Sequence, residues 1–214
     1  AVTPDYAPME MRSVEAIPDG PGWQYEPKWD GFRALAHRDG ANVAIGSKNG
    51  QPLARYFPEI VAALAALTGD GFSLDGELVV PQAGALSFDA LQQRIHPAAS
   101  RVALLARTTP ALLLVFDLLR EDGTEIAGEP LIRRRARLEA FARRFPAGGP
   151  IRLSPATTSR AVVDDWFARV GGALDGVVAK KLDAAYAAGR RDAAVKVKKL
   201  RTADCVVGGF RFAA

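Results

Sequence analysis

The dipeptide Asp39-Gly40 separates two strand-like segments, residues 33–38 and 42–47, and this arrangement constrains the fold more than any other feature of the sequence. Asp-Gly favours the tight turn of a β-hairpin, because glycine adopts positive φ without strain. Further strands are expected from Trp23 and at 73–80, 111–119, 151–153, 175–181 and 194–199. Helices are expected at 55–67, 87–95, 130–145 and 160–170. Strands that form hairpins and also alternate with helices predict an α+β fold, with largely antiparallel sheets flanked by helices.

The composition is that of a globular domain. Hydrophobic residues make up 49% of the 214 positions, which is enough for a substantial core. No apolar run approaches the roughly 20 residues that span a membrane, so we expect no membrane association. The single cysteine, Cys205, excludes an internal disulfide and a multi-cysteine metal site. The net charge of +4 is compatible with a polyanionic partner such as nucleic acid.

The two ends of the sequence differ from its middle. Residues 1–22 are rich in proline and glycine and are expected to wrap the surface as a lead-in to the domain. The segment Cys205–Phe212 resembles one more strand, after which the sequence stops. A strand without partners is marginally stable. The sequence therefore predicts one domain over 1–204 and the truncated start of a second domain at 205–214.

Residues 26–33 (EPKWDGFR) place Lys28 and Arg33 on either side of an Asp-Gly turn. A lysine is a nucleophile only when it is neutral, and its ordinary pKa is about 10.4. A nucleophilic lysine therefore needs burial or neighbouring cations. Taken alone, the segment is equally compatible with an ordinary turn that carries solvated charges.

Four other segments supply the groups that a nucleotide and a divalent cation require: residues 74–77 (LDGE), 115–118 (VFDL), 175–180 (DGVVAK) and 195–198 (VKVK). Lys196 and Lys198 share one face of a strand, because alternate residues point the same way. Carboxylates suit a hard cation, lysines suit phosphates, and an aromatic ring suits a base. Together these segments predict a nucleotide–Mg²⁺ site.

The order of the motifs KxDGxR, DGE, FD, DGVVxK and KxK resembles that of the covalent nucleotidyltransferases: ATP-dependent DNA ligases, RNA ligases and mRNA capping enzymes. The details are most similar to the bacterial DNA ligases of non-homologous end joining. The segments that carry this similarity are 47–50 (SKNG), 86–88 (LSF) and Tyr186 with 189–191 (GRR). The resemblance covers roughly residues 8–210, and as an ordered set it is highly specific. It implies the ATP-grasp-like nucleotidyltransferase fold of a ligase adenylation domain. It also implies that 205–214 begin an oligonucleotide-binding (OB-fold) domain.

The resemblance assigns the chemistry of the nucleotide to five residues. Lys28 would attack the α-phosphorus of ATP, release pyrophosphate and form a covalent lysyl-AMP. Lys196 and Lys198 would bind the α-phosphate and stabilise charge in the transition state, because phosphoryl transfer depends on positioning and electrostatics. Arg33 would contact the ribose or the phosphates, and Phe116 would stack on adenine.

Further roles follow from the same resemblance. Glu26 would read the adenine edge, and Glu77 would hold the ribose or the metal, which is Mg²⁺ or Mn²⁺. Asp175 would lie near the same metal. The remaining nucleotide-binding positions are Lys48, Val178 and Lys180.

The sequence departs from the family pattern at three places. Asp175 stands where the family usually has glutamate, so this shorter carboxylate is expected to reach a metal only through water. Lys48 stands where arginine is common, and it offers a point charge in place of a bidentate grip. Ala194-Val195 replaces a pair that commonly contains tryptophan. The family's last motif and its OB-fold domain are absent, so we expect slow self-adenylation and poor sealing.

The expected substrate of the whole protein is nicked or broken double-stranded DNA, to whose 5′-phosphate AMP would pass for sealing in repair. Expected partners are a C-terminal OB-fold domain on the same chain and end-joining proteins, in a bacterial cytoplasm at the nucleoid. An RNA ligase or capping-type enzyme is the first alternative, and a catalytically silent nucleic-acid-binding fragment is the second.

The arginine-rich helix at 130–145 is interpreted as a solvated face, and His37 and His96 as surface or packing residues.

Overall fold

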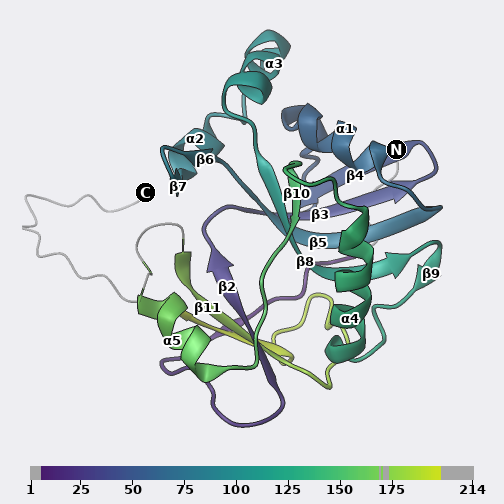
Figure 1. Cartoon of the computed structure of the whole chain (residues 1–214). Coiled ribbons are helices and arrows are strands. Elements are labelled where there is room, and N and C mark those ends of the chain that lie inside the picture. The colour runs from purple at the N-terminus through teal and green to yellow at the C-terminus, as the bar shows by residue number, and fades with distance from the viewer. Residues whose placement is uncertain (1–5, 169, 171–173, 199–214) are drawn as a thin grey trace, which may run out of the picture.

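Two β-sheets form the framework of the protein in a computed structural model, which describes residues 6–168, 170 and 174–198 (Figure 1). The smaller sheet has the strand order β1-β12-β11-β2 and lies lower in the view of Figure 1. Its strands are β1 (Arg12–Ser13), β12 (Ala194–Lys198), β11 (Leu174–Lys181) and β2 (Trp23–Trp29). The pairings of β11 with β12 and with β2 are antiparallel, whereas β1 joins β12 in parallel.

The larger sheet has the order β10-β8-β5-β3-β4, and β9 pairs with β8. Its strands are β10 (Ile151–Leu153), β8 (Leu112–Glu121), β5 (Gly71–Val79), β3 (Phe32–Asp39), β4 (Asn42–Ser47) and β9 (Thr124–Glu125). Only the β10–β8 pairing is parallel among the described strands of this sheet. A separate two-stranded ribbon consists of β6 (Pro81–Gln82) and β7 (Ala85–Leu86).

Helices flank both sheets, as expected for the predicted α+β fold. They are α1 (Pro58–Ala66), α2 (Phe88–Gln92), α3 (Ala99–Thr108), α4 (Leu131–Phe141) and α5 (Arg160–Ala168), with 3₁₀ turns at Ala54–Tyr56 and Ala142–Arg144. Among the described residues, no helix is both long and apolar enough to cross a membrane. The expected strands and helices are confirmed with small shifts of their ends, but α3 was not predicted. The expected strand at Cys205–Phe212, and with it the second domain at 205–214, lies outside the described residues.

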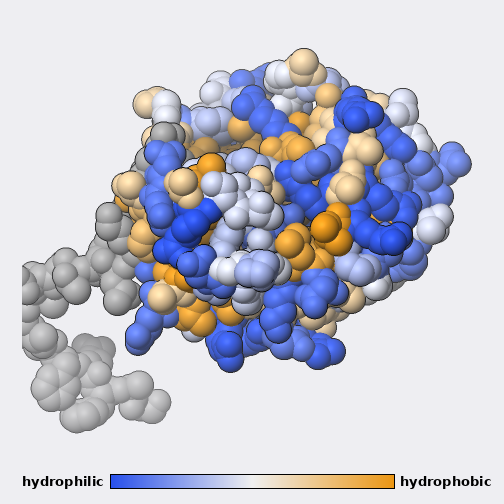
Figure 2. Space-filling view, turned by 60° about the horizontal axis from the view of Figure 1, so that its bottom comes forward, coloured by the Kyte–Doolittle hydropathy of each residue, from blue (hydrophilic) through white to orange (hydrophobic). Residues whose placement is uncertain are grey.

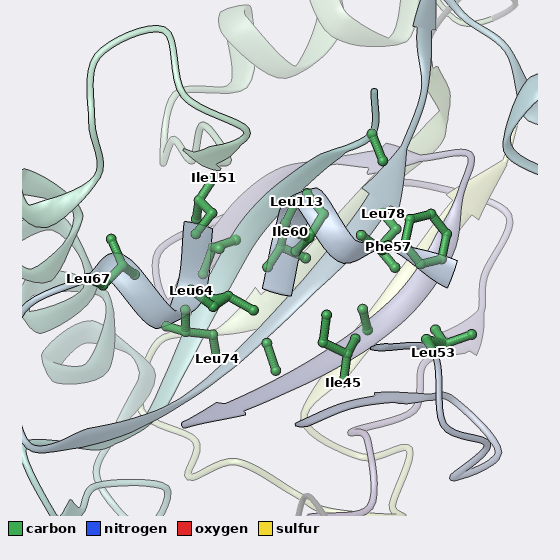
Figure 3. Packing of buried hydrophobic residues seen from close by; sticks show 14 of the residues in the cluster. Ile45, Leu53, Phe57, Ile60, Leu64, Leu67, Leu74, Leu78, Leu113 and Ile151 are labelled. Atoms are coloured by element: carbon green, nitrogen blue, oxygen red, sulfur yellow. The ribbon is translucent and has the colours of Figure 1, made fainter. Parts of the chain in front are cut away.

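The main core lies between α1 and the larger sheet (Figure 3). Ile60 and Leu64 of α1 are fully buried there, together with Leu74 and Leu78 of β5. Alternate residues of a strand point to opposite faces, so Asp75 and Glu77 of β5 point away from this core. The apolar side chains of β5 therefore pack into the main core, and its two carboxylates face the smaller sheet.

Residues 30 and 31 carry the chain from β2 in the smaller sheet to β3 in the larger one. A Cβ atom at Gly31 would lie 2.2 Å from the carbonyl oxygen of Leu78, which belongs to the backbone of β5. Backbone in the middle of a sheet cannot move aside cheaply. The glycine of the KxDGxR motif is therefore required by the close approach of the β2–β3 connection to the backbone of β5.

The arginine-rich helix α4 differs from its expected role. Arg134 is 1% exposed and binds Asp117 with both ends of its guanidinium, from Nε at 2.9 Å and Nη2 at 3.0 Å. Arg135 is also buried and donates to the carbonyl oxygen of Ser154 at 3.0 Å. The interpretation of α4 as a solvated face is thus wrong for these two residues, because a buried guanidinium is stable where a carboxylate or carbonyl satisfies it.

Large apolar side chains on the surface occur at single, separate positions. The exposed ones among the described residues are Ile95, Leu104, Ile132 and Val162. The face in Figure 2 is mostly hydrophilic, with hydrophobic patches between hydrophilic residues. His37 is buried and its Nδ1 lies 2.7 Å from Ser73 Oγ, which confirms that it is a packing residue.

Candidate active site

A cavity of about 350 Å³ lies between the two sheets and is lined from both of them. The smaller sheet contributes side chains of β2, β11 and β12, and the larger sheet contributes side chains of β3, β5 and β8. Among the lining residues are these predicted site residues: Glu26, Lys28, Arg33, Lys48, Glu77, Phe116, Val178, Lys180 and Lys196. Lys198 and Asp175 do not line the cavity itself.

The pairing of strands in the smaller sheet explains why its polar side chains gather on one face. Lys28 lies opposite Gly176, which lies opposite Lys198 on the next strand. Two residues further along β11, Val178 lies opposite Glu26 of β2 on one side and opposite Lys196 of β12 on the other. Residues two apart on a strand share a face, so both rows point into the space between the sheets.

The other face of the smaller sheet is apolar and packs on α5. Tyr25, Val177 and Val195 are buried there with Val163 of α5. The motifs DGVVxK and KxK thus alternate between a core face and a cavity face. This alternation confirms the expectation that Lys196 and Lys198 share a face.

Asp175 reaches Lys28 through an irregularity in β11. The register of β11 against β2 shifts between Leu174 and Gly176, and a bulge of this kind re-aims the intervening side chain. Asp175 Oδ2 lies 2.7 Å from Lys28 Nζ and 2.8 Å from Lys198 Nζ. Partial burial alone would raise the pKa of Asp175, but the hydrogen bonds from Lys198 and Lys28 outweigh it and the pKa is lowered.

Gly176 makes this arrangement possible. Its φ is +154°, and a Cβ atom there would lie 2.0 Å from the carbonyl oxygen of Val197 on β12. Any side chain would collide with that backbone and would also occupy the gap between Lys28 and Lys198. Glycine at this position therefore lets the two lysines share one carboxylate.

Lys196 adds a third cation to the same face. Burial lowers its pKa, and the charges of Lys28 and Lys198 lower it further. Lys28 and Lys196 in the partly enclosed cavity, with Lys198 beside them on the same face of the sheet, form a favourable place for an anion. The chemistry of this end of the cavity therefore suits a phosphate group.

Arg33 faces the opposite wall and is held by Asp75, a residue that sequence reasoning did not place in the site. Arg33 Nε and Nη2 each donate to one oxygen of Asp75 at 2.5 Å. Burial acts to lower the pKa of Arg33, but the charge and the hydrogen bonds of Asp75, together with nearby Tyr186 and Glu77, outweigh burial and raise it. The guanidinium carbon lies 4.8 Å from the ring centre of Phe116. A charged residue inside the apolar run 74–80 was the available signal for Asp75.

Glu77 lies beside this pair on the cavity face of β5. Burial raises its pKa to about 7, although the charges of Arg33 and Lys28 oppose the rise. A carboxyl group that titrates near neutral pH can change its charge with the pH of the cell. Glu77 is thus the one described residue of the cavity whose pKa is raised to near neutrality.

Lys180 and Glu26 form a buried ion pair at the adjoining end of the cavity. Lys180 Nζ lies 2.7 Å from Glu26 Oε2, and Gln24 Nε2 donates to Oε1 at 2.8 Å. Lys180 Nζ also lies 4.6 Å from the ring centre of Phe116. Its nearest anion is therefore a side chain, so any contact of Lys180 with a phosphate would compete with Glu26.

The lead-in segment differs from its expected role as a surface wrap. Residues 8–13 line the cavity, and β1 adds to the edge of the smaller sheet beside Lys196. Glu10 pairs with Arg191 at 2.6 Å and lies 3.9 Å from Lys48. A two-residue strand carries almost no periodic signal, which is why the sequence did not reveal this wall.

A divalent cation would need phosphate oxygens of a bound nucleotide, as well as protein carboxylates, to complete its coordination at this site. No group of three or more His, Cys, Asp or Glu side chains suited to a metal occurs within the part of the chain that the structure describes. Mg²⁺ often takes one or two carboxylates and fills its other positions with phosphate oxygens and water. Glu77 and Asp175, one from each sheet, are compatible with that pattern.

Comparison with known proteins identifies the family. The family model described as "ATP dependent DNA ligase domain" matches residues 9–198. DNA ligase C2 of Mycolicibacterium smegmatis is 49% identical over 211 residues, which are 98% of this chain and 58% of that protein. DNA ligase C of Mycobacterium tuberculosis is 46% identical over 213 residues, or 98% of this chain and 59% of that protein. The chain thus spans about three fifths of the length of the curated relatives it matches.

Solved structures agree with the family and the fold. A mycobacterial DNA ligase D complexed with ATP and MES superposes with a TM-score of 0.69 at 28% identity, covering 91% of this chain and 60% of that one. A Chlorella virus DNA ligase-adenylate, at 17% identity and a TM-score of 0.63, shares the fold over 90% of this chain and 67% of that one. The predicted resemblance to bacterial end-joining ligases is therefore confirmed, and the chain belongs to the family of ATP-dependent DNA ligase domains.

Proposed function

We propose that the cavity between the sheets binds ATP and that Lys28 becomes covalently adenylated. The observation that carries the proposal is the position of Lys28 Nζ, which lines the cavity 2.7 Å from Asp175 and on the same face as Lys196 and Lys198. Phe116 and Arg33 lie on the opposite wall. A cationic end and an aromatic wall in one cavity are complementary to the phosphates and the base of a nucleotide.

In the proposed reaction, a bond forms between Lys28 Nζ and the α-phosphorus of ATP. The bond from that phosphorus to the bridging oxygen of the β-phosphate breaks, and pyrophosphate leaves with both bonding electrons. Only a neutral amine attacks, so Lys28 must leave its ion pair with Asp175. Its nitrogen gives up one proton to water before the attack and a second as the phosphoramidate forms. Lys196 and Lys198 stabilise the charge that develops on the α-phosphate oxygens.

The remaining roles are assigned by position in the cavity. Glu26, held by Lys180 and Gln24, presents a hydrogen-bond acceptor for the adenine edge, and Phe116 stacks on the ring. Lys48 and Val178 complete the wall around the nucleotide. Glu77 and Asp175 would hold Mg²⁺ or Mn²⁺ together with phosphate oxygens, and the metal would neutralise charge on the phosphates.

For the whole protein, we propose transfer of AMP to the 5′-phosphate of nicked or broken double-stranded DNA, followed by sealing during repair. The named relatives are DNA ligases, and the multifunctional non-homologous end joining protein LigD of Mycolicibacterium smegmatis is 30% identical over 218 residues, which are 97% of this chain and 26% of that protein. In this proposal residues 1–204 are the adenylation domain, and an OB-fold domain and end-joining proteins act with it. The corresponding location is the bacterial cytoplasm, at the nucleoid.

Intact mass after incubation with Mg·ATP tests the proposal directly. We expect a gain of one adenylyl group in the wild-type chain and in Lys181→Ala, an exposed lysine on the same sheet, but not in Lys28→Ala. Incubation with GTP separates a capping-type enzyme from a ligase. Labelling by GTP in place of ATP would indicate a capping-type enzyme, and the absence of any covalent adduct would favour a silent nucleic-acid-binding fragment.

A further inference from the structure

We propose that Tyr186 is a positioning residue for the nucleotide cavity, and that its single hydroxyl group joins the lead-in wall to Arg33. This inference rests on the proposed function, because it assumes that the cavity binds ATP. Tyr186 does not line the cavity itself. Its effect on the nucleotide must therefore pass through the residues that it holds.

Tyr186 lies in the connection between β11 and β12, and it reaches from the smaller sheet to the larger one. Its hydroxyl donates to Asp75 Oδ2 at 2.7 Å and accepts a hydrogen bond from the backbone N–H of Met9 at 2.9 Å. The side chain is 7% exposed, so both hydrogen bonds are shielded from water. A hydroxyl has one donor hydrogen, and here that hydrogen is directed at a buried carboxylate.

On one side, the hydroxyl fixes the carboxylate that holds Arg33. Asp75 is fully buried, and its two oxygens receive both Arg33 donors as well as the Tyr186 hydroxyl. Arg33 in turn lies over the ring of Phe116 on the cavity wall. Charge-assisted hydrogen bonds of this kind set geometry closely, so rotation of the Asp75 carboxylate would turn the guanidinium with it.

On the other side, the hydroxyl fixes the lead-in segment. Met9 is buried, and it forms a β-bridge with Ala188, two residues beyond Tyr186. Glu10 N donates to Arg190 O at 2.9 Å, and Gly189 N donates to Pro8 O at 3.2 Å. Residues 186–190 therefore hold the same three lead-in residues, 8–10, that form part of the cavity wall.

The hydroxyl stays a donor at any pH at which the protein works. Burial raises the pKa of Tyr186, and the negative charge of Asp75 raises it further, although the charge of Arg33 and the hydrogen bond from Met9 oppose the rise. Tyr186 thus connects two cavity walls through a hydroxyl group that stays protonated. Its removal should loosen both walls together while the aromatic ring still fills its place in the core.

Tyr186→Phe tests the inference, with Tyr25→Phe as the matched control. Tyr25 is also buried, and its hydroxyl donates to Pro18 O at 2.8 Å, but its side chain packs beneath α5 on the other face of the smaller sheet. Binding is measured by calorimetry with α,β-methylene-ATP, whose carbon bridge prevents AMP transfer. We expect the dissociation constant of Tyr186→Phe to rise about tenfold, which corresponds to about 1.4 kcal/mol. That of Tyr25→Phe should equal the wild-type value.

The ATP dependence of lysyl-AMP formation supplies the second readout. In Tyr186→Phe the half-saturating ATP concentration should rise, while the plateau rate should stay within about twofold of wild type, as for a loss of uniform binding. Unchanged affinity with a lowered melting temperature in Tyr186→Phe would overturn the inference and leave a purely structural role. Wild-type chain that binds the analogue but forms no lysyl-AMP would overturn the proposed function alone. Failure of wild type to bind the analogue would overturn both.

Discussion

Asp75 of β5 and Asp117 of β8 stand directly opposite each other on neighbouring strands, and both carboxylates are buried. Like charges placed opposite each other across a sheet destabilise it. Each aspartate has its own buried arginine: Arg33 for Asp75 and Arg134 for Asp117. Arg134 also donates to the carbonyl oxygen of Ala184, two residues before Tyr186. The two ion pairs thus neutralise the facing carboxylates of β5 and β8.

Replacement of Arg134 by methionine should destabilise the fold strongly. The change leaves Asp117 buried without its partner, and breaking a buried pair in this way costs about 3–5 kcal/mol. Chemical denaturation measures the loss. Arg133→Met on the same helix is the control, because Arg133 is exposed and its loss should change stability by no more than about 0.5 kcal/mol. Equal effects of the two substitutions would contradict the structural role of the Arg134–Asp117 pair.

Stability should depend on pH through Glu77. Its pKa is about 7 in the folded protein and near 4.5 when the chain is unfolded, so the folded state holds the proton more tightly. The resulting stabilisation is present below pH 4.5 and is lost as pH rises to 7, by at most about 3 kcal/mol. Glu77→Gln cannot titrate and should lose this dependence. The measurement is the unfolding free energy of both proteins at pH 5 and pH 8, and parallel changes in the two would refute the assignment.

Phe116 should contribute to nucleotide affinity through its ring. Phe116→Leu keeps an apolar side chain but removes stacking, which is worth about 0.5–1.5 kcal/mol beyond area burial. We therefore expect weaker binding of α,β-methylene-ATP by Phe116→Leu, with a folded protein by circular dichroism. Phe116→Tyr keeps the ring and should bind close to the wild-type level. If Phe116→Leu bound the analogue as tightly as wild type, Phe116 would be a packing residue of the core and not a nucleotide-binding residue.

Gly31 should not tolerate even alanine. The added Cβ would meet the backbone oxygen of Leu78 at 2.2 Å, and overpacking of this kind costs about 1–3 kcal/mol. Gly128→Ala is the control, because a Cβ atom there meets nothing within 4 Å. Thermal unfolding of the two variants provides the comparison. A melting temperature of Gly31→Ala equal to that of Gly128→Ala would show that the connection between β2 and β3 can move away from β5 without cost.

The sequence was sufficient to predict those parts of the site that depend on alternation within a strand. Lys196 and Lys198 share a face because they are two apart on one strand. The motif spacing also placed Glu77 and Phe116 on strands that face the cavity. These relationships are local, so periodicity reveals them.

Contacts between distant segments were not predictable in the same way. Tyr186 meets Asp75 and Met9 across 111 and 177 residues of chain, and no local pattern records such a meeting. Arg134 was interpreted as solvated because it stands in a run of arginines, but helix packing turned it inward onto Asp117. Tertiary packing overrides composition at such positions.

Localisation of the adenylyl group by peptide mass spectrometry tests the central claim most directly. The wild-type chain is incubated with Mg·ATP, digested under conditions that preserve a phosphoramidate, and its lysine-containing peptides are sequenced by fragmentation. We predict AMP on Lys28 and on no other lysine, including Lys196 and Lys198 beside it. AMP on a different lysine, or its retention by Lys28→Ala, would contradict the assignment of the nucleophile.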